Sequence, residues 1–65
     1  MKRAQAQQML DEAYIERFKT LFDVLHIGAV AGTIEQAAGR FEAGVHMLND
    51  TRGRAEQILE KIFPE

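Results

Sequence analysis

The sequence contains no cysteine, no serine and no tryptophan, and its only proline is Pro64. Without cysteine the chain cannot form disulfide bonds, and without serine or cysteine it has no nucleophile for a Ser/His/Asp or Cys/His triad. A chain of 65 residues buries a small share of its surface and is usually stabilised by disulfides, a metal or a partner. We therefore expect a single domain that is not an enzyme and that depends on association with protein.

The charges are nearly balanced, with 8 basic and 10 acidic residues and a net charge of −2. They are interspersed, so no basic block indicates direct nucleic-acid binding. No apolar run approaches the roughly 18 residues of a membrane span. Met1-Lys2-Arg3 is not followed by the apolar stretch of a secretory signal. We expect a cytoplasmic protein without membrane association.

The N-terminal part of the chain has the period of an amphipathic helix over residues of about 4–26. At about 100° per residue, its large apolar side chains fall within one arc of about 140°. This helix 1 apolar face contains Leu10, Tyr14, Ile15, Phe18, Leu21, Phe22 and Leu25. The only charged residue inside the arc is Asp11. An arc this wide is typical of a helix that packs in a globular core.

Residues 27–33 contain two glycines, several β-branched residues and no charge. This composition predicts a loop between two helices. His26 then lies at the C-terminus of the first helix, where an imidazole interacts favourably with the helix dipole.

A second helix is predicted at residues 34–62. Thr33 is a good N-cap, and Gln36 three residues later completes a capping box. Pro64 disfavours a helical conformation in the residue before it, so the helix ends near Ile62.

The second helix carries a regular pattern at positions a and d of four heptads, which we call the heptad seam. Its d positions are Ile34, Phe41, Leu48, Ala55 and Ile62, and its a positions are Ala38, Val45, Arg52 and Leu59. The e positions are mostly acidic (Glu35, Glu42, Asn49, Glu56), and the g positions are mostly small (Ala37, Gly44, Thr51, Ile58). Small residues beside a seam let a second backbone approach closely, and an ordinary broad core stripe accounts for the same pattern. The sequence leaves both interpretations open.

Arg52 is the only charged residue of the heptad seam. A paired charge at such a position fixes register or partner choice. Alternatively its stem packs while the guanidinium reaches Glu56 or water, and Asp11 is a further possible partner. Poor helix formers surround it, so a kink is possible at residues 49–53. The uninterrupted heptad phase favours a continuous helix.

Neither histidine indicates a metal or cofactor site. His46 lies four residues after Glu42, but two ligands do not make a site, and di-iron bundles use Glu-x-x-His instead. Glu12 and Glu16 share a polar arc with Lys19, which is typical of a solvated helix face. We predict no catalytic residues, no metal and no cofactor.

Part of the chain resembles the exonuclease VII small subunit. The resemblance rests on Leu25, Gly28 and Val30, on Ile34-Glu35-Gln36-Ala37 and Phe41-Glu42-Ala43-Gly44-Val45, and on Ala55-Glu56. It covers about half the chain, with different spacing before Ile34 and before Ala55. The resemblance implies a short helical hairpin that acts as a non-catalytic accessory subunit of a DNA nuclease.

These observations predict an all-α antiparallel helical hairpin that assembles into a four-helix bundle. The expected function is a small protein–protein interaction module of the chaperone, adaptor or inhibitor type, acting through a coiled-coil-like helical surface. The alternatives are a non-catalytic subunit of a larger enzyme and a self-assembling structural bundle. The expected partner is protein, either a second copy in a homodimer or a different chain in a hetero-complex.

Overall fold

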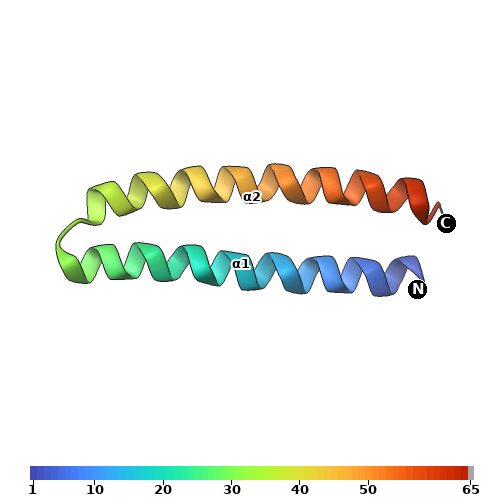
Figure 1. Cartoon of the computed structure of the whole chain (residues 1–65), viewed down its shortest axis with the longest axis horizontal. Helices are drawn as coiled ribbons and strands as arrows, with labels where there is room; N and C mark the ends of the chain where they lie inside the picture. Colours follow the sequence, from blue (N-terminus) through green and yellow to red (C-terminus); the bar gives the residue numbers. More distant parts are fainter. Residues whose placement is uncertain (65) are drawn as a thin grey trace.

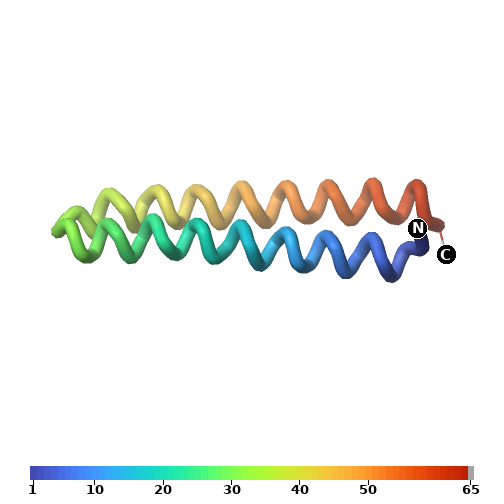
Figure 2. The backbone as a smooth tube through the Cα atoms, turned by 60° about the horizontal axis from the view of Figure 1, so that its bottom comes forward, coloured from blue at the N-terminus to red at the C-terminus, as the bar shows by residue number. Residues whose placement is uncertain are grey.

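The computed structural model describes residues 1–64 and consists of two antiparallel helices, α1 (Arg3–Ala31) and α2 (Ile34–Ile62) (Figure 1). The chain turns at one end of the hairpin, and both termini lie at the other. The Cα atoms extend over 49 × 16 × 9 Å, so the molecule is long and only one helix layer thick (Figure 2). The predicted all-α helical hairpin is confirmed. Neither helix, within residues 1–64, has a stretch long and apolar enough to cross a membrane.

The connection between the helices consists of only two residues, Gly32 and Thr33. Gly32 has a φ of 79°, the left-handed conformation that glycine adopts without a Cβ penalty. The Thr33 N–H donates to the Gly28 carbonyl at 2.8 Å, and the Gly32 N–H donates to the Ala29 carbonyl at 3.3 Å. These two bonds form a Schellman motif, which satisfies the last carbonyls of α1 and reverses the chain at once.

The predicted loop at residues 27–33 is wrong over its first five residues, because α1 continues to Ala31. The two glycines that suggested a loop have different roles. Gly32 ends the helix, whereas Gly28 is a buried position inside it. A Cβ placed on Gly28 would overlap the Cβ of Ala37 on α2. Gly28 is therefore a close-packing residue of a helix and does not interrupt it.

Helix α2 begins at Ile34 and ends at Ile62, the bounds that the sequence predicts. Its N-terminus differs from the expected capping box, because Thr33 makes no side-chain capping bond. The Thr33 hydroxyl instead lies 3.5 Å from the Gly28 carbonyl of α1. At the other end, the Phe63 N–H donates to the Leu59 carbonyl at 2.8 Å. The tight connection thus uses the threonine side chain to join the two helices.

The helix runs without interruption through residues 49–53, where the sequence left a kink possible. Two of the poor helix formers are held by side-chain bonds. The Thr51 hydroxyl donates to the Met47 carbonyl at 2.8 Å, and the Asn49 side chain accepts a bond from Tyr14 of α1. These bonds satisfy polar groups that favour turns in other contexts.

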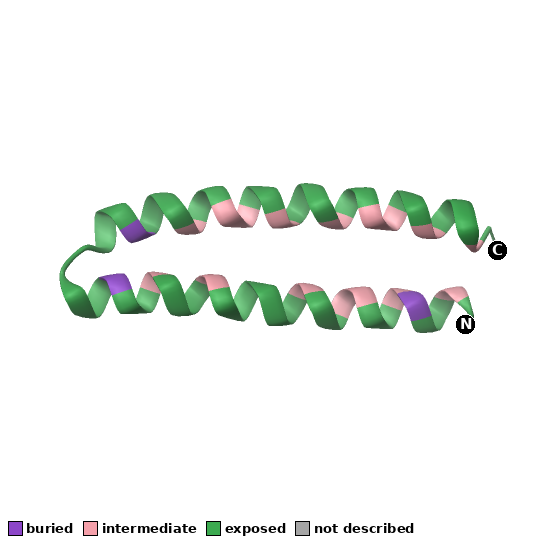
Figure 3. Ribbon diagram, in the orientation of Figure 1, coloured by how far each residue is buried: buried purple, intermediate pink, exposed green. Residues whose placement is uncertain are grey.

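Small residues determine where the helices approach most closely. Ala6, Gly28 and Ala37 are buried, and a Cβ on Gly44 would lie 2.6 Å from Leu21 Cδ2. The buried and half-buried residues follow the facing sides of both helices, and the outer sides are exposed (Figure 3). The contact between the helices is therefore a single narrow stripe.

The close contact at Gly28 predicts opposite effects of two glycine-to-alanine substitutions. Gly28→Ala should lower the free energy of unfolding by about 1–3 kcal/mol, because its methyl group forces the helices apart. Gly39→Ala is the matched control, since nothing lies within 4 Å of a Cβ at that position. It should raise stability by about 1 kcal/mol through helix propensity alone. Urea unfolding followed by circular dichroism measures both, and a stabilising Gly28→Ala would contradict the packing.

Candidate protein interaction surface

Most of the large apolar side chains of the hairpin remain in contact with solvent. Among the described residues, the only buried hydrophobic ones are Ala6 and Ala37, and no side chain is fully buried. Twelve large hydrophobic residues are exposed, from Phe18 at 39% to Val30 at 77%. An exposed apolar surface on this scale is typical of an interaction site.

A cluster of polar side chains joins the two helices nearer to the termini than to the turn; we call Asp11, Tyr14, Asn49, Arg52 and Glu56 the central polar cluster. Arg52 Nη2 lies 3.1 Å from Asp11 Oδ1, and Arg52 Nε lies 3.8 Å from Glu56 Oε1. The Arg52 guanidinium carbon lies 4.6 Å from the centroid of the Tyr14 ring. The Tyr14 hydroxyl donates to Asn49 Oδ1 at 2.8 Å. Arg52 thus contacts both of the acidic partners that the sequence left open.

The central polar cluster is only partly shielded from water. The side chains of Arg52 and Asp11 are 35% and 45% exposed. An ion pair this accessible contributes about 0.2–1 kcal/mol, and the contact of the guanidinium with the Tyr14 ring adds a similar amount. The cluster therefore fixes the register of the helices more than it stabilises them.

Aromatic side chains continue from this cluster toward the turn. The Tyr14 and Phe18 rings stack with centroids 6.4 Å apart, and Phe18 meets Phe41 of α2 edge to face at 5.9 Å. Phe22 stacks on His26 at 6.3 Å. His26 is thus a residue in the interior of α1, and its expected position at the helix C-terminus is wrong because the helix continues to Ala31.

We call the side of the hairpin that carries these rings the aromatic face. It is formed by Ile15, Phe18, Phe22, Ile34, Ala38, Phe41 and Val45. Phe41 and Val45 are half-buried, whereas Ile15, Phe22 and Ile34 are 51%, 53% and 43% exposed. The aromatic face extends from the central polar cluster to the turn.

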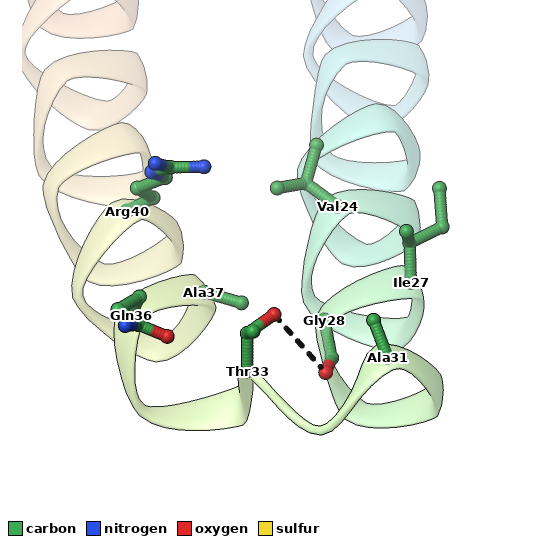
Figure 4. Close-up of a pocket in the computed structure, with 8 residues that line it drawn as sticks. All are labelled: Val24, Ile27, Gly28, Ala31, Thr33, Gln36, Ala37 and Arg40. Atoms are coloured by element: carbon green, nitrogen blue, oxygen red, sulfur yellow. Dashed lines mark hydrogen bonds between the residues drawn. The ribbon is translucent and has the colours of Figure 1, made fainter.

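The other side of the hairpin, which we call the opposite face, carries hollows between the helices and, among residues 1–64, no phenylalanine cluster. A hollow of about 450 Å³ lies next to the turn, between the two helices (Figure 4). Its lining is formed by Val24, Ile27, Gly28, Ala31, Thr33, Gln36, Ala37 and Arg40. A smaller hollow of about 160 Å³ farther along includes Ala13, Arg17, Leu48 and Thr51. The helical period places the exposed Met47 and Ile58 of α2 on this same face.

The structure divides the residues of the heptad seam between contact and exposure. Phe41, Val45, Leu48, Arg52, Ala55 and Leu59 are half-buried, whereas Ile34, Ala38 and Ile62 are exposed. On the helix 1 apolar face, Leu10, Tyr14, Leu21 and Leu25 are half-buried, and Phe18 and Phe22 are exposed. Both sets therefore contain residues that one helix pair leaves uncovered.

The residues of closest helix contact were not among those that the sequence singled out as the seam. Ala37 and Gly44 belong to its small g edge, and Ala6 and Gly28 lie outside the large apolar arc of the first helix. The small g edge was the available signal for this contact. Arg3 lies 3.8 Å from Glu60 and donates to the Phe63 carbonyl at 3.3 Å, a contact between the termini that no sequence pattern indicates.

The residues weighed as metal ligands remain scattered on the surface. His46 Nε2 lies 3.9 Å from Glu42 Oε1, and both side chains are 77% exposed. Among residues 1–64, no group of three or more His, Asp or Glu side chains is close enough to hold a metal ion.

Comparison of the chain with models of known protein families, with curated proteins and with solved structures gives no match.

The central polar cluster predicts a charge-exchange experiment. Asp11→Lys places two cations at the 3.1 Å contact with Arg52, and it should destabilise the hairpin by about 1 kcal/mol. Asp11→Lys combined with Arg52→Glu should recover most of this loss, because opposite charges face each other again. Urea unfolding of the unchanged chain, of Asp11→Lys, of Arg52→Glu and of the double variant measures the coupling. Glu12→Lys on the outer side of α1 is the control, and equal effects of the two lysine variants would contradict the assignment.

Proposed function

We propose that this chain is a small non-catalytic protein–protein interaction module, whose working surface is the apolar part of the hairpin that its own two helices leave exposed. The proposal includes a role inside the cytoplasm and a partner that is protein. The observation that supports it most strongly is the burial pattern: the large apolar residues are half-buried at most, and twelve are exposed.

The physical reason is that burial of apolar surface provides most of the free energy of folding. Two helices that touch along one stripe exclude water only there. Each exposed isoleucine or phenylalanine could gain about 1.5–3 kcal/mol on full burial. Covering these side chains with another protein would therefore stabilise the fold and create a specific complex in one step.

A chaperone, adaptor or inhibitor would use such a surface in the same way, and so would an accessory subunit of an enzyme. No family match favours a particular enzyme, so the proposal names none. Assembly of the hairpin into a four-helix bundle is one form that the association can take.

The proposal predicts that the helical content of the isolated chain depends on association. At low micromolar concentration, circular dichroism should show less helix than the two 29-residue helices require, because their apolar sides are uncovered. Raising the protein concentration or adding a partner should increase the helical signal and the melting temperature. Full helicity with a cooperative, concentration-independent melt of the monomer would contradict the proposal.

A further inference from the structure

Exposed apolar side chains lie on both faces of the hairpin, and the large rings of the two helices lie on the same one. On α1, the line of contact with α2 runs through Leu21 and Gly28, and Phe18, Phe22 and Ile15 lie roughly 60° to 120° around the helix from that line. On α2, Ala38 and Val45 each follow a contact residue, Ala37 and Gly44, and so lie about 100° around the helix from it. This rotation is toward the same side of the hairpin as Phe18 on α1. The contact of Phe18 with Phe41 shows that both displacements lead to one side. The aromatic face is thus a continuation of the contact between the helices.

The size of the exposed surface indicates how large the missing cover is. The hairpin exposes 5225 Å², whereas a compact monomer of 7.4 kDa exposes roughly 4,200 Å². The excess is about 1,000 Å². If two chains each buried that excess against the other, the interface would total about 2,000 Å², the size found in permanent homodimers.

The radius of gyration shows that the single hairpin is elongated for its length. The radius of gyration is 15.1 Å, whereas a compact chain of 65 residues has about 11 Å and a chain of twice that length has about 14 Å. The hairpin is therefore elongated, and a second hairpin laid on the 9 Å thin molecule would thicken the particle without lengthening it.

We propose that the aromatic face is the interface of a homodimer, in which two copies of this chain pack face to face as a four-helix bundle. This inference rests on the proposed function and deepens it by naming the partner as a second copy. In such a two-fold interface residue i of one copy contacts residue j of the other, and a charge that becomes buried there is costly unless it has a partner.

The two faces differ in whether their charged residues have an ionic partner. The charged residues of the central polar cluster beside the aromatic face already contact one another: Arg52 with Asp11 and with Glu56. On the opposite face, Arg17 and Arg40 line the two hollows, and neither forms an ion pair within residues 1–64. Pairing the opposite face with its own copy would bury these cations without an ionic partner, whereas pairing the aromatic face would bring the acidic α2 edge, Glu35 and Glu42, only to the margin of the interface.

The closing experiment compares two double variants of the full chain by size-exclusion chromatography with light scattering. Ile15→Lys with Phe22→Lys changes the aromatic face, and Met47→Lys with Ile58→Lys changes side chains on the other side of α2. The two isoleucines are matched, since Ile15 and Ile58 are 51% and 56% exposed, and Phe22 and Met47 are both exposed, at 53% and 72%. At tens of micromolar, the unchanged chain and the second variant should have twice the mass of one chain. The first variant should be monomeric, with dimerisation weakened more than about 100-fold.

Circular dichroism on the same samples separates this inference from the proposed function. A poorly helical monomer of the unchanged chain would overturn the second copy as partner and leave the proposed function standing. A fully helical, cooperatively melting monomer would overturn both. A dimer that survives the first double variant but dissociates with the second would place the interface on the wrong face and overturn the inference.

Discussion

Two helices in contact can shield from water only the stripe along which they touch. The large apolar side chains outside this stripe therefore stay exposed unless another surface covers them. The two-residue connection at Gly32 and Thr33 reverses the chain, and α1 and α2 lie side by side. Small residues such as Gly28 and Ala37 then bring the backbones together near the turn. A close approach of this kind shields backbone and small side chains. The large side chains are left at the flanks of the stripe, where only another surface can cover them.

The central polar cluster fits the same picture. An arginine on an apolar seam is costly to bury alone, and here its guanidinium lies between Asp11, Glu56 and the Tyr14 ring. These contacts join α1 to α2 at a defined register and mark where the aromatic face ends. The apolar surface between the cluster and the turn is therefore bounded, as an interface would be.

The sequence predicts the helical hairpin and the bounds of α2, because a regular apolar period and the proline at position 64 act locally along the chain, although Thr33 does not form the expected capping bond. The predicted end of α1 is wrong. A glycine that permits close packing cannot be distinguished from a glycine that ends a helix unless the residue facing it on the other helix is known. Gly28 faces Ala37, and that contact exists only in the folded hairpin.

Asp11 is a candidate partner of Arg52 from the sequence alone, since both interrupt apolar arcs. The contact of Tyr14 with Asn49 had no such signal. Gly39 and Gly53 have open space around them, and nothing in the structure explains why either is glycine.

Packing of two copies through the aromatic face would cover that face in solution and leave the other side of the hairpin exposed. The most direct measurement is paramagnetic relaxation of methyl groups by a soluble probe, compared by NMR between Ile15 and Ile58. In the single hairpin these two side chains are almost equally exposed, at 51% and 56%. If two copies pack through the aromatic face, the Ile15 methyl groups will be protected from the probe and those of Ile58 will relax as solvent-exposed groups do. Equal relaxation at both residues would contradict this packing.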